Sequence, residues 1–130
     1  MGFITIIVKK GLKMWFFTTL GFYSVVHKSP CNKDELLVRA RCKEDIEKLI
    51  KKLSQTYNFN GKVIESPKAD YAYRMIVPRE IWAAFMSRTA IELDYDNFKN
   101  TIPSKDHLRH DAYFKCWEIM CCWQNEGIVI

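Results

Sequence analysis

The sequence predicts an α+β fold in which an antiparallel sheet of about five strands carries two or three helices on one face. Two observations lead to this prediction. Short segments rich in aromatic and β-branched residues make up much of the chain before residue 78, and one strongly periodic helical segment interrupts them. Two further helical segments follow, which gives the expected order βββαββαα.

The first two strands form a predicted hairpin. Residues 15–27 are dense in aromatic and β-branched side chains, and only Gly21 breaks the run. A glycine between two such runs is typical of a tight turn that joins antiparallel strands. Residues 29–34 are rich in turn-forming side chains and are expected to end the hairpin.

A third strand is predicted over residues 35–41. Side chains alternate between the two faces of a strand, so Arg39 and Arg41 share one face with Leu37. The opposite face carries Leu36, Val38 and Ala40.

The segment that follows is the most regular helix in the sequence. Apolar side chains recur at helical spacing, and oppositely charged pairs four residues apart lie outside this stripe. The apolar stripe is Ile46, Leu49, Ile50 and Leu53, and the pairs are Glu44–Lys48 and Glu47–Lys51.

Two more strands and two more helices complete the fold. Strands are expected over residues 62–65 and 71–77, separated by a turn at 66–70. Pro78 suits the first position of a second helix. Proline has no backbone N–H, and the N–H at this position would have no partner within the helix. The buried stripe of that helix is expected to be Ile81, Trp82, Phe85, Met86 and Thr89.

The remaining chain is predicted to be a loop and a last helix. Residues 94–101 have weak helix propensity and are expected to form a loop with inward-facing aromatic side chains. Ser104 can cap the last helix, and the apolar residues 128–130 either add a short strand or fray. The predicted buried stripe of the last helix is Leu108, Ala112, Cys116, Ile119 and Trp123, widened by Tyr113, Trp117 and Met120. The whole order resembles an elaborated ferredoxin-like arrangement.

Length and composition favour one domain over residues 14–130. Residues 1–13 are either an additional strand or a non-native extension in front of a start at Met14. The apolar residues 3–8 are too short to span a membrane, and Lys9 and Lys10 stand where a signal peptide needs small residues. A cytoplasmic protein without a membrane segment is therefore expected.

The five cysteines and the net charge narrow the function only slightly. The odd cysteine count, without a CxxC pair, predicts reduced and mostly buried thiols. Lys9, Lys10 and Lys13 supply more than half of the net charge of +5. Overall charge therefore does not by itself predict nucleic-acid binding.

Catalytic and cofactor motifs are not found in the sequence. It has no GxGxxG, P-loop, HExxH, GxSxG or EF-hand pattern, and we predict no cofactor and no metal site. His107 and His110 stand three residues apart in the last helix. They are either two surface histidines or a pair for metal or acid–base chemistry, for which the sequence offers no third ligand.

A set of cations is the strongest candidate for a ligand site. Arg39 and Arg41 share a strand face, and Arg74 lies in the middle of a later strand. On an uncovered, concave sheet face, several guanidinium groups beside aromatic rings would suit phosphate binding and base stacking. On a flat face they would be solvated or paired with Glu35 and Glu65. The set is completed by Lys99, with Arg109 and His110 as additions.

Four segments resemble a family of small uncharacterised bacterial proteins. They are residues 14–26 (MWFFTTLGFYSVV), 38–41 (VRAR), 94–99 (DYDNFK) and 109–113 (RHDAY), and the resemblance extends over about residues 14–124. It implies a bacterial, cytosolic setting and a start at Met14, and it implies no particular activity. It favours as site residues Arg39, Arg41, Asn97, Lys99, His110 and Tyr113.

Three functions of different classes remain open. The first is binding of an anionic or phosphorylated ligand, a nucleotide or single-stranded nucleic acid, at Arg39, Arg41, Arg74 and Lys99. The second is a protein-interaction, inhibitor or regulatory module. The third is a small hydrolase or nuclease in which His110 is the general base and Lys99 or Arg41 stabilises negative charge. The sequence favours the first and leaves the oligomeric state open.

Overall fold

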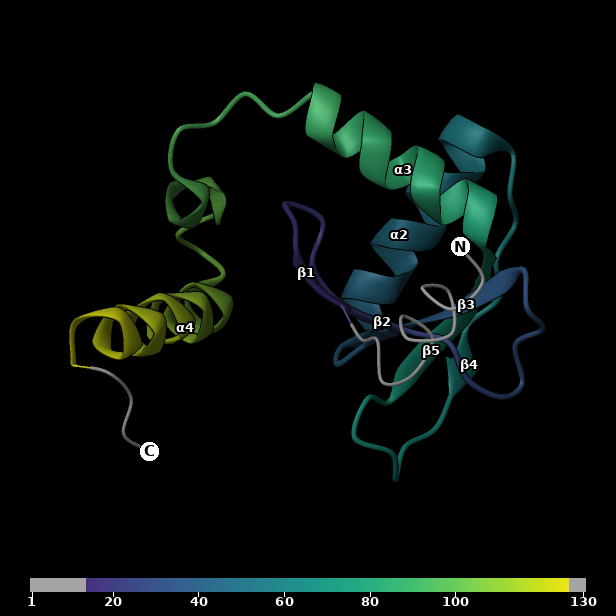
Figure 1. The fold of residues 1–130 in the computed structure, drawn as a ribbon, viewed down its shortest axis with the longest axis horizontal. Coiled ribbons are helices and arrows are strands. Elements are labelled where there is room, and N and C mark those ends of the chain that lie inside the picture. The colour runs from purple at the N-terminus through teal and green to yellow at the C-terminus, as the bar shows by residue number, and fades with distance from the viewer. Residues whose placement is uncertain (1–13, 127–130) are drawn as a thin grey trace, which may run out of the picture. The chain divides into compact units, whose positions relative to one another are not determined.

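A computed structural model describes residues 14–126 of the chain. These residues belong to two compact units that divide between Glu92 and Leu93 (Figure 1). We call residues 14–92 the sheet unit and residues 93–126 the helical unit. Residues 1–13 and 128–130, for which an extension and a final strand were predicted, lie outside the described residues.

The sheet unit contains all five strands and two helices. In chain order these are β1 (Met14–Phe17), β2 (Phe22–Val26), β3 (Glu35–Ala40), α2 (Lys43–Tyr57), β4 (Ile64–Glu65), β5 (Tyr73–Pro78) and α3 (Arg79–Ile91). The helical unit contains the 3₁₀ helix η1 (Phe98–Thr101) and α4 (His107–Glu126).

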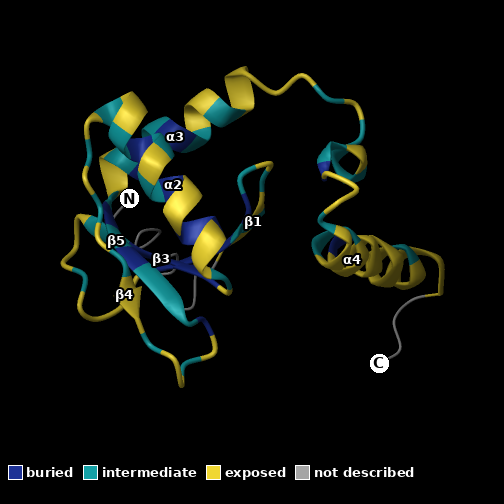
Figure 2. Cartoon of the chain, turned by 180° about the vertical axis from the view of Figure 1, so that it is seen from behind, coloured by how far each residue is buried: buried dark blue, intermediate teal, exposed yellow. Residues whose placement is uncertain are grey.

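The strands form one sheet in the order β1-β2-β3-β5-β4, and every neighbouring pair is antiparallel. Helices α2 and α3 cover the same face of this sheet (Figures 1 and 2). The predicted α+β class and element order are therefore confirmed. Without β1, the order β2-β3-β5-β4 is that of a ferredoxin-like sheet whose last strand has moved to the start of the chain. In it, β5 lies between the two strands that α2 connects, which is the split βαβ arrangement.

The core lies between the sheet and its two helices. Three residues of the α2 stripe, Ile46, Leu49 and Leu53, are fully buried, and α3 contributes Trp82 and Phe85. All five belong to the predicted stripes, whose other members are half-buried: Ile50, Ile81, Met86 and Thr89. From the sheet, the alternate side chains facing the helices are Tyr23, Val25, Val38, Ala40, Met75 and Val77.

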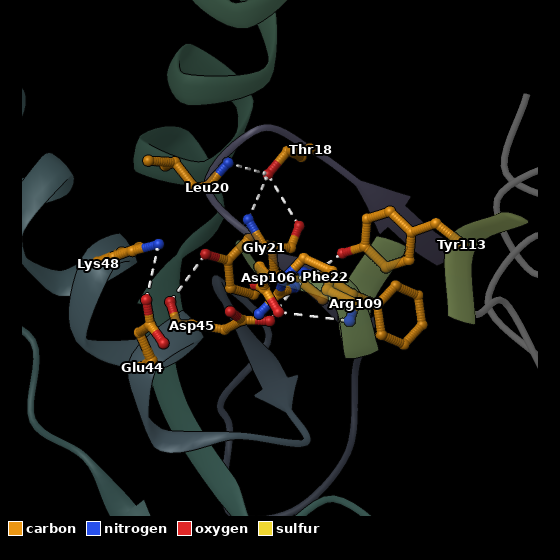
Figure 3. A network of polar contacts seen from close by, with 11 residues as sticks. Thr18, Leu20, Gly21, Phe22, Glu44, Asp45, Lys48, Asp106, Arg109 and Tyr113 are labelled. Carbon is orange, nitrogen blue, oxygen red and sulfur yellow. Dashed lines mark hydrogen bonds and ion pairs between the residues drawn. The ribbon is translucent and has the colours of Figure 1, made fainter. Parts of the chain in front are cut away.

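The β1–β2 turn is fixed by Thr18, Gly21 and Asp45. The Thr18 hydroxyl donates to the Gly21 carbonyl at 2.9 Å and accepts from the Leu20 and Gly21 amides (Figure 3). A carboxylate oxygen of Asp45, in the first turn of α2, accepts from the Phe22 amide at 3.0 Å. A side chain at Gly21 would collide with this carboxylate. Glycine is required here because of this close approach.

Several predicted details are wrong. Residues 98–101 form η1 instead of a loop, because the Asn97 side chain accepts from the Lys99 amide at 3.1 Å. Pro78 ends β5 and precedes α3. The last helix begins at His107, and Asp106, in place of Ser104, accepts from a first-turn amide, that of Arg109 at 3.3 Å.

The expected burial of the cysteines and of the last helix is also wrong. Cys116 and Cys122 are exposed, and the other cysteines are half-buried. Of the residues predicted to be buried in α4, Tyr113 is buried, whereas the stripe is exposed at Leu108, Ala112, Cys116, Ile119 and Trp123. Periodicity identified this helix correctly, but it does not say what covers an apolar face. Within residues 14–126, no helix is both long and apolar enough to cross a membrane.

Candidate anion-binding site on the sheet

One transverse row of residues crosses all five strands on the face away from the helices. Strand register pairs Trp15 with Ser24, Ser24 with Arg39, Arg39 with Arg74, and Arg74 with Ile64. Directly paired residues share a face, and this row alternates with the core residues Val38 and Met75. The sheet therefore places Arg39 and Arg74 opposite one another on neighbouring strands. Like charges in this position destabilise a sheet.

Tyr71 brings the three arginines together. The guanidinium carbon of Arg39 lies 4.5 Å from the centre of the Tyr71 ring, and that of Arg41 lies 4.2 Å from it. The Arg74 Nε donates to the Tyr71 carbonyl oxygen at 3.1 Å. Cations stacked on a ring are stabilised by its quadrupole. We call Arg39, Arg41, Arg74 and Tyr71 the arginine cluster.

Arg39 is the buried member of the cluster. The residue is only 9% exposed, and one terminal nitrogen donates to the Ser24 hydroxyl at 2.7 Å. Its Nε is also buried, and within residues 14–126 no acceptor lies in hydrogen-bond reach of it. Burial lowers the pKa of Arg39; Tyr71 acts in the opposite direction, and Arg74 lowers the pKa further. A guanidinium remains charged despite such a shift. Arg39 therefore carries a positive charge that is poorly solvated by water.

Arg41 is the accessible member. Its side chain is 54% exposed and forms an ion pair of 3.1 Å with Asp70, which is itself 76% exposed. The acid is therefore Asp70, and neither Glu35 nor Glu65, the partners considered from the sequence, pairs with this arginine. An exposed pair of this kind contributes little stability. An incoming anion can replace Asp70 at small cost.

Aromatic rings continue from the cluster toward β1. The Phe22 ring centre lies 6.5 Å from that of Tyr71 and 6.1 Å from that of Trp15. Trp15 is 66% exposed. This face therefore carries an exposed indole on the same side of the sheet as three cations, with strand β2 between Trp15 and Arg39.

Sequence reasoning missed Trp15, Phe22, Ser24 and Tyr71 as members of this site. Alternation within the hairpin indicates that Trp15, Phe22 and Ser24 share a face, but strand register is needed to align that face with Arg39. The sequence predicts Tyr71 at the start of a strand over residues 71–77, and this detail is wrong. Tyr71 lies before β5, in a turn closed by a hydrogen bond of 2.8 Å from the Ser66 amide to the Ala72 carbonyl.

The other predicted site residues lie in the helical unit. Asn97 caps η1, and the Lys99 ammonium lies 4.7 Å from the centre of the Trp117 ring. Tyr113 is buried and stacks on Phe98 with ring centres 5.8 Å apart.

Arg109 and His110 belong to the first turn of α4. Arg109 forms a 3.0 Å ion pair with Asp106 and donates to the Tyr113 hydroxyl at 2.9 Å (Figure 3). His110 is half-buried, and its amide donates to the Asp106 carbonyl. The contacts of Asn97, Lys99, Tyr113 and Arg109 stabilise the helical unit itself.

Within residues 14–126, no three His, Cys, Asp or Glu side chains are grouped so that they could hold a metal ion. No protein-family model, curated protein or solved structure matches the chain. The resemblance of residues 14–124 to a bacterial family therefore stays a prediction.

Proposed function

We propose that the protein binds an anionic, phosphorylated ligand, a nucleotide or single-stranded nucleic acid, at the arginine cluster. The observation that carries the proposal is the convergence of three guanidinium groups on Tyr71 with one weakly held carboxylate, Asp70, among them. Grouped arginines suit phosphate because each guanidinium can donate two parallel hydrogen bonds.

The members have different roles in this proposal. Arg41 and Arg74 contact the ligand, because Arg41 is exposed and Arg74 is half-buried. Arg39 is the buried member and contributes a positive charge that solvent screens poorly. Burying a charge without an ion pair costs stability, although stacking on Tyr71 offsets part of that cost. Residues that break the rules of stable folding are expected at functional sites.

A thermal-shift screen tests the proposal on the full chain. The probes are pyrophosphate, ATP and a short single-stranded oligonucleotide, each at low and moderate salt. A ligand at about 100 times its Kd adds about 2.7 kcal/mol of stability. We expect a shift that falls with salt and is lost in Arg41→Ala.

Arg88→Ala is the matched control, because Arg88 is an equally exposed arginine of α3 that pairs with Glu92. The shift should survive in this variant. If both variants lost the thermal shift equally, the shift would depend only on the net charge of the protein. The absence of a shift with every probe would overturn the proposal.

A protein-interaction module is the second candidate, and one observation favours it. In the helical unit, α4 exposes Trp117, Ile119, Met120 and Trp123, each by about half of its surface. Exposed apolar patches are typical of surfaces that bind proteins. If a second copy is the partner, sedimentation velocity of the full chain should show concentration-dependent association that Trp123→Ser weakens. A monomer at all concentrations would exclude that partner.

A further inference from the structure

We infer that the ligand is single-stranded nucleic acid, whose bases stack on Trp15 while its phosphates bind the arginine cluster. This inference rests on the proposed function and narrows it. The observation behind it is the row Trp15–Ser24–Arg39–Arg74, which places an exposed indole and the cations on one sheet face.

Spacing across the sheet favours a chain of nucleotides. Trp15 and Arg39 are separated by one intervening strand, β2. Neighbouring strands lie about 4.8 Å apart, so the two backbones are about 10 Å apart. A strand of linked nucleotides can place one base on Trp15 and further phosphates at Arg41 and Arg74. The row thereby runs across the sheet, from β1 toward β5.

The indole has the exposure that stacking requires. Trp15 is 66% exposed, and its one described ring contact is an edge contact with Phe22 at an interplanar angle of 75°. Tyr71, in contrast, is buried, and two guanidinium groups already stack on it. Trp15 is therefore the stacking residue, and Tyr71 holds the cations.

Charge on the row favours nucleic acid over a protein. From Trp15 on β1 to Ile64 on β4, the row contains two arginines and no acid. Stacking requires unpaired bases, which excludes a duplex. The row offers few polar groups that could read base edges, so we expect weak sequence preference.

Fluorescence anisotropy of the full chain tests the inference. The probes are fluorescein-labelled single-stranded DNA and RNA of about 12 nucleotides, within the usual site size, and the corresponding DNA duplex. We expect Trp15→Ala to weaken single-strand binding about 10-fold or more and Trp15→Phe to preserve most of it. Pyrophosphate has no base to stack, so its thermal shift with the wild type reports on the arginine cluster separately from Trp15.

Trp123→Ala is the control, because Trp123 is a similarly exposed tryptophan of α4. Comparison of the DNA and RNA strands tells whether the 2′-hydroxyl contributes. Duplex binding as tight as single-strand binding, or full affinity in Trp15→Ala, would overturn the inference. If pyrophosphate still bound to the wild type, the proposed function would stand. Absence of pyrophosphate and oligonucleotide binding alike would overturn both. Self-association that Trp15→Ala abolishes, without oligonucleotide binding, would assign the face to a protein partner.

Discussion

Arg39 donates a 2.7 Å hydrogen bond to the hydroxyl of Ser24, and both residues are buried on the face of the sheet away from the helices. This is an unusual use of a buried arginine, because its partner is a neutral hydroxyl. Buried charges are ordinarily paired with an opposite charge. The arrangement leads to opposite expectations for stability and for binding.

We predict that Arg39→Met keeps or raises stability and weakens anion binding. Methionine preserves much of the apolar stem and removes a buried charge. Replacing buried ion pairs by apolar residues is often neutral or stabilising by about 1–4 kcal/mol, and in the described part of the chain Arg39 has only the neutral Ser24 hydroxyl as its hydrogen-bond partner. Loss of the poorly screened charge should lower affinity for pyrophosphate about 10-fold. Urea unfolding and a pyrophosphate titration measure the two effects. A large loss of stability together with unchanged affinity would show that Arg39 is purely structural.

Gly21→Ala should destabilise the sheet unit by about 2 kcal/mol. The added methyl would lie 2.6 and 2.7 Å from the two carboxylate oxygens of Asp45, and overpacking of this kind costs about 1–3 kcal/mol. Displacing the carboxylate would also weaken the hydrogen bond from the Phe22 amide. The urea midpoint followed by circular dichroism measures the loss.

Gly61→Ala is the matched control for this substitution. The nearest atoms to a methyl at Gly61 are the sulfur of Met75 and, at 3.2 Å, a ring carbon of Phe59. Met75 is fully buried, but its thioether can change rotamer, whereas the Asp45 carboxylate is held in place by the Phe22 amide. We therefore expect a smaller loss of stability than at Gly21. Equal losses at both positions would show that the cost is a general effect of replacing glycine and does not come from the Asp45 carboxylate.

The local sequence pattern predicted which segments form helices and strands better than it predicted which strands pair with each other. The stripe of α2 follows from its periodicity, because helix faces depend on neighbours three and four residues away. The shared face of Arg39 and Arg41 follows equally from alternation. The pairing of Arg39 with Arg74 does not, because β3 and β5 are separated by α2 and β4 and their register depends on the whole core.

Tyr71 and the last helix show the same limit. Tyr71 reaches the arginines because a turn at Ser66–Ala72 folds the chain back, and the sequence shows this turn only as a run of turn-forming residues. Helical spacing in α4 likewise predicts a helix with an apolar stripe. Whether that stripe is buried depends on what packs against it, and helical spacing carries no information about that.

Cys31 is predicted to react slowly with alkylating reagents. Burial raises the pKa of its thiol, and Glu35 raises it further. The thiolate is the reactive form, so at a pH below the pKa less of Cys31 is reactive than of an ordinary thiol. Exposed Cys116 and Cys122 should be labelled first by iodoacetamide near pH 8, with Cys31 accelerating as pH rises. Mass spectrometry of peptides against time measures the order, and early labelling of Cys31 would contradict it.

Two variants of Asn97 distinguish whether this residue of the helical unit stabilises the fold or contacts the ligand. Its side-chain oxygen accepts from the Lys99 amide at 3.1 Å and from the Lys99 ammonium at 3.5 Å. Asn97→Asp keeps an acceptor at this position, whereas Asn97→Ala removes it at a cost of about 1 kcal/mol, as for other caps. If capping is its role, only the alanine variant should lower stability, and both should bind oligonucleotide like the wild type. If Asn97 contacts the ligand, Asn97→Asp should weaken binding more than Asn97→Ala, because a new carboxylate repels phosphate. Urea unfolding and anisotropy on the same two variants distinguish these results.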